Sequence, residues 1–100
     1  MSDLFGRNIR YENRAAEAIQ KAKDEWDSIE DIINALEWGL MHDPDLGVLL
    51  NEKGLRGFVF PGARSRNEPD IDVLYGYDDI NITVHDLIFR EAKFHYAGHA

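Results

Sequence analysis

The hydrophobic residues of this chain change their spacing near its middle. Up to residue 42 they recur every three or four residues, as in an amphipathic helix, and from residue 55 they alternate, as in a strand. A stripe of either kind is stable only when another apolar face covers it. The sequence therefore predicts an α+β domain, with helices in its first half packed on a sheet formed by its second half.

Two helices are expected in the first half, after a short strand over residues 8–12. Asn13 is predicted to cap the first helix. Ser28, with Asp31 three residues later, resembles a capping box and predicts the start of the second helix. Pro44 predicts its end, because the residue before a proline disfavours the α conformation. We expect the two helices to pack as an antiparallel hairpin.

Three strands are expected in the second half, over residues 55–60, 71–77 and 80–89. The link at residues 78–79 is short enough for a hairpin, so these strands should form an antiparallel meander. Residues 45–50, which precede them, are expected to add a turn of helix. The predicted core combines the helical and strand stripes: Ile29, Ile33, Leu36, Leu40, Leu55, Val73, Tyr75, Ile82 and Val84, with Ile80 on the same strand face as the last two.

The length and composition limit the class of protein. A chain of 100 residues with 44% apolar side chains has material for one core, so residues 1–100 are expected to be a single domain. The sequence has no cysteine, which excludes disulfides and thiolate metal sites. Residues 1–10 lack the apolar core of a signal peptide, and no apolar run is long enough to span a membrane. We expect a cytoplasmic protein without a membrane association.

The formal net charge of −8 opposes nonspecific binding to nucleic acid. Residues 1–50 carry five basic and eleven acidic side chains, a net −6, whereas residues 51–100 carry six and eight, a net −2. Between residues 53 and 67 the chain has basic residues and no acid. This distribution predicts a local basic stripe on an acidic body.

Four histidines raise the question of a metal site, but neither they nor the carboxylates have the spacing of a known metal-binding motif. No glycine-rich phosphate loop and no nucleophile-elbow serine occurs in the sequence. We therefore expect no metal and no cofactor. His85 shares a strand face with Asn81 and Thr83 and is expected to be structural rather than catalytic.

Arginines lie in or beside the predicted strands, at positions 56, 64, 66 and 90. A rigid sheet that held them on one face would give a site for phosphate and for the extra negative charge of a phosphorane-like transition state. Scattered, solvated arginines are the alternative. The residues alone leave both readings open.

The order of strand, helical hairpin and three-stranded meander, together with short matching segments, resembles the RelE/ParE superfamily of type II toxin–antitoxin toxins. The resemblance covers residues 8–96. The segments that carry it are residues 35–38, residues 42–44 with Gly47, residues 54–56, residues 69–75, the hairpin at residues 77–79, and a last strand that ends in Arg90.

The resemblance implies a site. Members of the RelE branch cut messenger RNA on the ribosome, with basic residues on the sheet and a C-terminal tyrosine or histidine. Carried over by position, Arg56, Arg64 and Arg90 are expected to hold the phosphate, and Tyr96 or His95 to lie near the scissile nucleotide. The reaction is expected to be metal-independent.

Two other functions fit the same fold. ParE-type members inhibit DNA gyrase without a nuclease site, and a third possibility is a noncatalytic protein-binding module. A basic concave face with a tyrosine would favour the nuclease, whereas a neutral face with an exposed apolar groove would favour the binding module. The resemblance also implies a cognate antitoxin that wraps the sheet or crosses the helical hairpin. Homodimerisation is left open.

Overall fold

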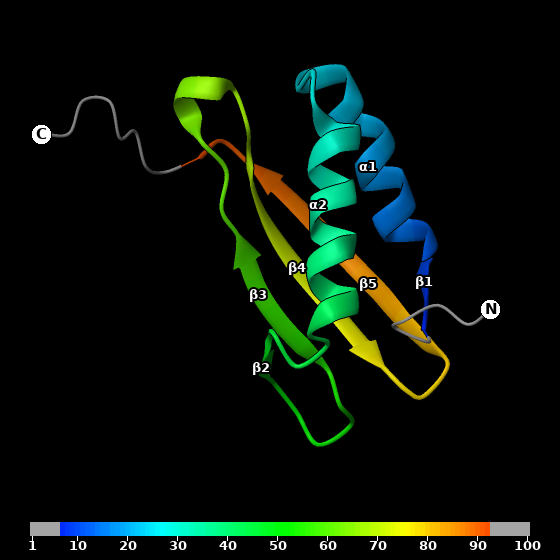
Figure 1. Ribbon diagram of the computed structural model, residues 1–100. Coiled ribbons are helices and arrows are strands. Elements are labelled where there is room, and N and C mark those ends of the chain that lie inside the picture. The colour runs from blue at the N-terminus through cyan, green and yellow to red at the C-terminus, as the bar shows by residue number, and fades with distance from the viewer. Residues whose placement is uncertain (1–6, 93–100) are drawn as a thin grey trace, which may run out of the picture.

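Two helices lie on one face of a five-stranded sheet in the computed structural model, which describes residues 7–92 (Figure 1). The strands are β1 (Asn8–Tyr11), β2 (Val48–Leu49), β3 (Arg56–Phe60), β4 (Asp70–Tyr77) and β5 (Asn81–Arg90). The helices are α1 (Asn13–Glu25) and α2 (Ile29–His42), and a 3-10 turn, η1 (Arg64–Arg66), lies between β3 and β4. The expected α+β fold of N-terminal strand, helical hairpin and antiparallel meander is confirmed.

The strand order across the sheet is β1-β5-β4-β3-β2. β3, β4 and β5 form the antiparallel meander, whereas β1 pairs with β5 in parallel. The first and last strands of the described chain are therefore neighbours. Their register places Tyr11 beside Val84, so the residue that follows β1 lies against β5.

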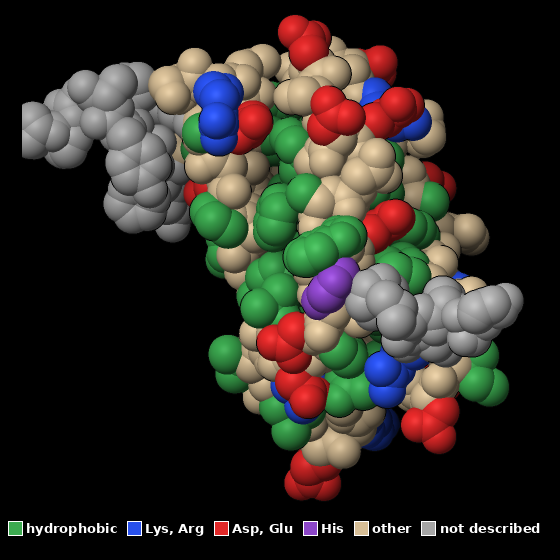
Figure 2. Space-filling view, viewed as in Figure 1, with side chains coloured by type: hydrophobic (Ala, Val, Ile, Leu, Met, Phe, Trp, Pro, Cys, Tyr) green, Lys and Arg blue, Asp and Glu red, His purple; other side chains and the backbone are tan. Residues whose placement is uncertain are grey.

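Acidic side chains are spread over the helix-covered side of the molecule (Figure 2). Six of the eleven acidic residues in the first half of the chain lie on α1 and α2. Much of the excess negative charge is thus carried by the helices, on one side of the sheet.

The turn of helix expected over residues 45–50 is wrong, because this segment is extended and contains β2. The Leu50 N–H donates to the Leu55 carbonyl at 2.7 Å, and β2 pairs with β3 in antiparallel. The Arg56 guanidinium donates to the Gly47 carbonyl at 2.8 Å. The Gly47 carbonyl, which would accept a backbone N–H in a further turn of helix, is therefore bound by the Arg56 side chain of β3 instead.

The predicted start of α2 after Ser28 and its end before Pro44 are confirmed, but neither predicted side-chain cap forms. α1 begins at Asn13 itself, with Glu12 at the N-cap position and no side-chain cap hydrogen bond. The Glu12 N–H donates to the Val84 carbonyl at 3.0 Å, which extends the β1–β5 pairing by one residue and delays the helix start to Asn13. Ser28 occupies the N-cap of α2 with φ −106° and ψ 29°, outside the extended conformation in which a cap hydroxyl reaches the helix.

The core lies between the helices and the facing side of β4 and β5. Its buried residues are Ala15, Ala22, Ile29, Ile32, Ile33, Leu36, Leu40, Ile71, Val73, Tyr75, Ile82, Val84 and Leu87. The predicted core is confirmed except at Leu55, which is half-buried and lies outside this cluster. Ile80 was expected to share the buried face of β5, but it precedes the strand in a turn and is 64% exposed.

Tyr75 ties the segment after α2 to the sheet. Its buried hydroxyl donates to the Pro44 carbonyl at 2.6 Å and accepts from the Gly47 N–H at 2.8 Å. Its ring packs edge-on against Phe58, and burial raises the pKa of the phenol. One side chain thereby satisfies two backbone groups of a segment that belongs to neither a helix nor the central sheet.

We predict that Tyr75→Phe destabilises the fold by about 1–3 kcal/mol, because the buried Gly47 N–H loses its acceptor. Urea unfolding followed by circular dichroism measures the change. Tyr77→Phe is the matched control, because the Tyr77 hydroxyl donates to Asp45 at the surface, and its loss should be smaller. Equal losses for the two variants would contradict this role of Tyr75.

Candidate functional site

The helices cover one face of the sheet, and the opposite face is called the uncovered face here. On β4 the helix side carries Ile71, Val73 and Tyr75, which are buried. Because side chains alternate along a strand, Asp72, Leu74 and Gly76 of β4 belong to the uncovered face. On β5 this face carries Thr83, His85, Asp86, Ile88 and Arg90.

A β-bulge interrupts β5 on this face. Tyr75 pairs with Val84 and Leu74 pairs with Asp86, so His85 is the extra residue between them. Simple alternation from the buried Val84 already places His85 on the uncovered face, and the irregularity shifts the alternation of the residues that follow it, so that Leu87 is buried.

Arg56 lies on the helix side of the sheet, since its partner on β4 is Tyr75. Its guanidinium lies 3.2 Å from the Asp45 carboxylate and also donates to the Gly47 carbonyl. Arg56 therefore holds the segment before β2, and its charge has a partner.

Arg90 lies on the uncovered face, where Asp72 binds it through two contacts of 2.5 and 3.2 Å. These contacts raise the pKa of the Arg90 guanidinium. Arg90 pairs with Asp70 on β4 and Arg56 with Tyr75, so the two arginines are five β4 residues apart, roughly 16 Å, on opposite faces. The structure does not bring Arg56 and Arg90 together.

Three residues of the predicted site stay predictions. Arg64 is the first residue of η1, and its side chain lies outside what the structure describes. His95 and Tyr96 lie beyond the described residues. Arg66, the remaining arginine of the stripe, pairs with Glu68 at 3.4 Å.

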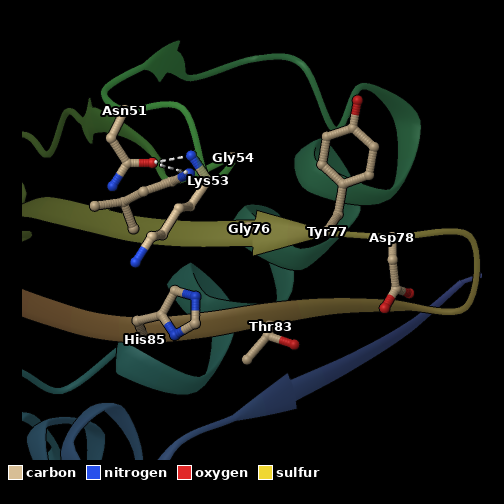
Figure 3. A pocket seen from close by; sticks show the side chains of 9 residues that line it. Asn51, Lys53, Gly54, Gly76, Tyr77, Asp78, Thr83 and His85 are labelled. Carbon is tan, nitrogen blue, oxygen red and sulfur yellow. Dashed lines mark hydrogen bonds between the residues drawn. The ribbon is translucent and has the colours of Figure 1, made fainter.

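Two hollows meet on the uncovered face at Thr83 and His85, and together they are called the polar hollow here (Figure 3). Their volumes, about 490 and 630 Å³, lie in the range of ordinary small-ligand sites. The lining residues come from β1, from the turn between β2 and β3, and from the β4–β5 hairpin: Arg10, Tyr11, Glu12, Asn13, Asn51, Lys53, Gly54, Leu55, Gly76, Tyr77 and Asp78, with the two shared residues.

Lys53 reaches the polar hollow from a tight turn. The Asn51 side-chain oxygen accepts the N–H groups of Lys53 and Leu55 at 2.9 and 3.1 Å, and Gly54 has a φ of +92°, which favours glycine. In Figure 3 the Lys53 ammonium points into the hollow on the side of His85. This turn places a cation over the sheet.

Lys53 and Arg10 are the basic residues that line the polar hollow. Within residues 7–92 neither makes an ion pair closer than 4.0 Å. Asp78 is the acid at the hairpin margin, and its carboxylate accepts the Ile80 and Asn81 N–H groups at 2.8 Å, which lowers its pKa. The polar hollow thus contains two cations that no carboxylate of the described residues approaches within 4.0 Å.

Glu12 and His85 are in direct contact in the polar hollow, with 3.0 Å between Glu12 Oε1 and His85 Nδ1. The parallel β1–β5 pairing brings them together across 73 residues of sequence. The alternation of β5 predicted the face of His85, but no sequence signal indicated that β1 would lie beside it. Sequence reasoning therefore missed this pair.

Aliphatic side chains occupy another part of the uncovered face, called the apolar patch: the exposed Val48, Leu50, Val59 and Ile88, and the half-buried Leu74. Gly57 lies beneath it. A Cβ atom there would be 3.0 Å from Leu50 Cδ1 and 3.2 Å from Leu74 Cδ2, so the glycine lets both leucines close over β3.

No family model matches this chain, and no curated protein matches it. Among the residues that the structure describes, no group of three or more His, Asp or Glu side chains is arranged to hold a metal ion. None of the described helices is long and apolar enough to cross a membrane.

The buried and the uncovered face of the sheet should respond differently to the same substitution. Val73→Thr places a hydroxyl in the core and should cost about 1–3 kcal/mol, whereas Val59→Thr on the 52% exposed neighbour in β3 should change stability by less than about 0.5 kcal/mol. The substitution is the same in size and in strand propensity at both sites. Urea unfolding of the two variants measures the difference, and a reversed order would show that the faces are assigned wrongly.

Proposed function

We propose that this chain is a toxin of the RelE/ParE type that cuts RNA, with the polar hollow as its substrate site. The observation that supports the proposal is the pair of cations, Lys53 and Arg10, that flank His85 without an ion-pair partner in the described chain. Single-stranded RNA carries one phosphate per nucleotide, and each phosphate is attracted by such unpaired cations.

The chemistry needs few groups. Attack by a ribose 2′-hydroxyl on the neighbouring phosphate requires a proton acceptor and positive charge near the phosphate oxygens. Lys53 and Arg10 supply the charge. Arg90 would join them only by releasing Asp72, and Tyr96 or His95 remains the proposed contact to the scissile nucleotide.

The acidic body of the protein suggests where the substrate comes from. At a net charge of −8, free RNA is repelled at long range, so a surface that already holds the messenger must supply much of the positioning. The translating ribosome does this. The proposal therefore places the protein in the cytoplasm.

Inducible expression in a bacterium tests the proposal, with growth and messenger integrity followed together. We expect growth arrest with messenger cleavage for the natural sequence. Lys53→Ala should slow cleavage about 10- to 100-fold, because one charge-assisted hydrogen bond to phosphate contributes about 1.5–3 kcal/mol. Lys21→Ala on α1 removes the same charge from the helix side and should leave cleavage unchanged.

Other outcomes point elsewhere. Growth arrest with intact messenger and damaged DNA would overturn the nuclease and indicate the gyrase inhibitor. Absence of growth arrest would indicate the noncatalytic binding module.

The apolar patch favours a second candidate function, binding of a protein partner. In this patch Val48 is 69% exposed, and Leu50 and Val59 are each 52% exposed. All residues of the patch are aliphatic, so it offers no aromatic ring on which an RNA base could stack. A partner segment with apolar side chains and basic flanks would complement both this patch and the acidic body. An antitoxin-like product of the adjacent gene is the proposed occupant.

We predict that Ile88→Glu weakens co-purification of that partner at least tenfold, because it replaces an exposed aliphatic side chain at the β5 margin of the patch, beside Asp72, with a carboxylate that an apolar partner surface would desolvate. Ile80→Glu is the control, since Ile80 is similarly exposed but lies in the turn before β5, outside the patch. Size-exclusion chromatography of the co-expressed proteins measures the complex. Equal loss in both variants, or a larger species formed by this chain alone, would contradict partner binding at the patch.

A further inference from the structure

We propose that His85 is the general base of the polar hollow and that Glu12 is its positioning residue, acting on the 2′-hydroxyl of single-stranded RNA. The inference rests on the proposed function and assigns its chemistry to two residues that belong to neither the arginine set nor the C-terminal pair. It is drawn from the geometry around one imidazole ring.

The contact with Glu12 fixes which ring nitrogen is available. A carboxylate can only accept a hydrogen bond, so Nδ1 of His85 carries the proton in the 3.0 Å contact. The other nitrogen, Nε2, then keeps its lone pair and can take a proton. The side chains of His85 and Glu12 are 40% and 55% exposed, so substrate can reach the pair.

The sheet beneath His85 is open toward Nε2. Gly76 is the neighbour in β4, and a Cβ atom built there would lie 3.6 Å from Nε2 and 3.4 Å from the Gly54 carbonyl oxygen. Any larger side chain would fill the space in front of the lone pair. Gly76 therefore leaves the space in front of Nε2 free on the side of the hollow, which an ordinary surface ion pair would not require.

The charges around the ring suit a phosphate ester. The Lys53 ammonium lies on the His85 side of the hollow, and Thr83 lies near His85 on β5 (Figure 3). Asp86, the residue after His85, lies 3.8 Å from Arg14, so its charge has a partner. A phosphate placed between Lys53 and Thr83 would bring the preceding ribose toward Nε2.

The proposed step balances without a metal or a redox partner. The 2′-hydroxyl gives its proton to Nε2 of His85, and the 2′-oxygen forms a bond to phosphorus while the bond from phosphorus to the 5′-oxygen breaks. The departing 5′-oxygen takes a proton from water, and the resulting hydroxide recovers the proton from His85. The products are a 2′,3′-cyclic phosphate and a 5′-hydroxyl end.

Chemical rescue with the purified protein tests the inference, with messenger on translating bacterial ribosomes as the substrate. His85→Ala should lower the cleavage rate about 10²- to 10⁴-fold, the usual contribution of a general base. Added imidazole should restore part of that rate in His85→Ala and none in Lys53→Ala. Glu12→Gln should lower kcat with KM unchanged, whereas Glu17→Gln, an acid of α1, should change neither.

The results separate this inference from the function on which it rests. Cleavage by the natural sequence that persists at full rate in His85→Ala overturns the inference and leaves the proposed function standing. An inactive His85→Ala protein that imidazole does not rescue also overturns it, because His85 would then be structural. If the natural sequence does not cleave, both fail together.

Discussion

A single helical hairpin has apolar surface for one face of a sheet, and this constraint shapes the rest of the described structure. The buried face of β4 carries Ile71, Val73 and Tyr75, which pack under α1 and α2. The alternate residues of the same strand are left on the other side without a covering layer. A polar hollow and an apolar patch on one face follow from this division, because that face is free to differ in chemistry along its length.

The many acidic residues of this chain affect individual cations as well as its net charge. Arg56 and Arg90, two of the three arginines expected to bind phosphate, each lie against an aspartate. Lys53 and Arg10 are placed differently, one on a tight turn and one on the edge strand, where no described carboxylate contacts them. The positive charge available to a ligand is therefore set by the position of each cation relative to nearby acids, and the net charge of the chain does not report it.

Periodicity was sufficient to predict the elements and most of the core, because burial of a stripe is a local property of the sequence. It failed where a distant side chain decides the backbone. The extended segment before β3 depends on the Tyr75 hydroxyl, 28 residues beyond Gly47. Arg56 was expected to share a face with Arg90, but a strand changes face at every residue, so a shift of one position reverses the assignment.

At the candidate site, too, the sequence pattern predicted a local property but not a contact between distant segments. The alternation of β5 predicted that His85 lies on the face opposite the core, and the structure agrees. Its partner Glu12 was not predicted, because the parallel pairing of β1 with β5 is a property of the whole topology. The same pairing has a consequence for the order of folding during synthesis. β1 leaves the ribosome long before β5 exists, and contacts between segments so far apart in sequence form late. The edge of the sheet that β1 completes, and with it the Glu12–His85 contact, can close only after β5 has been synthesised.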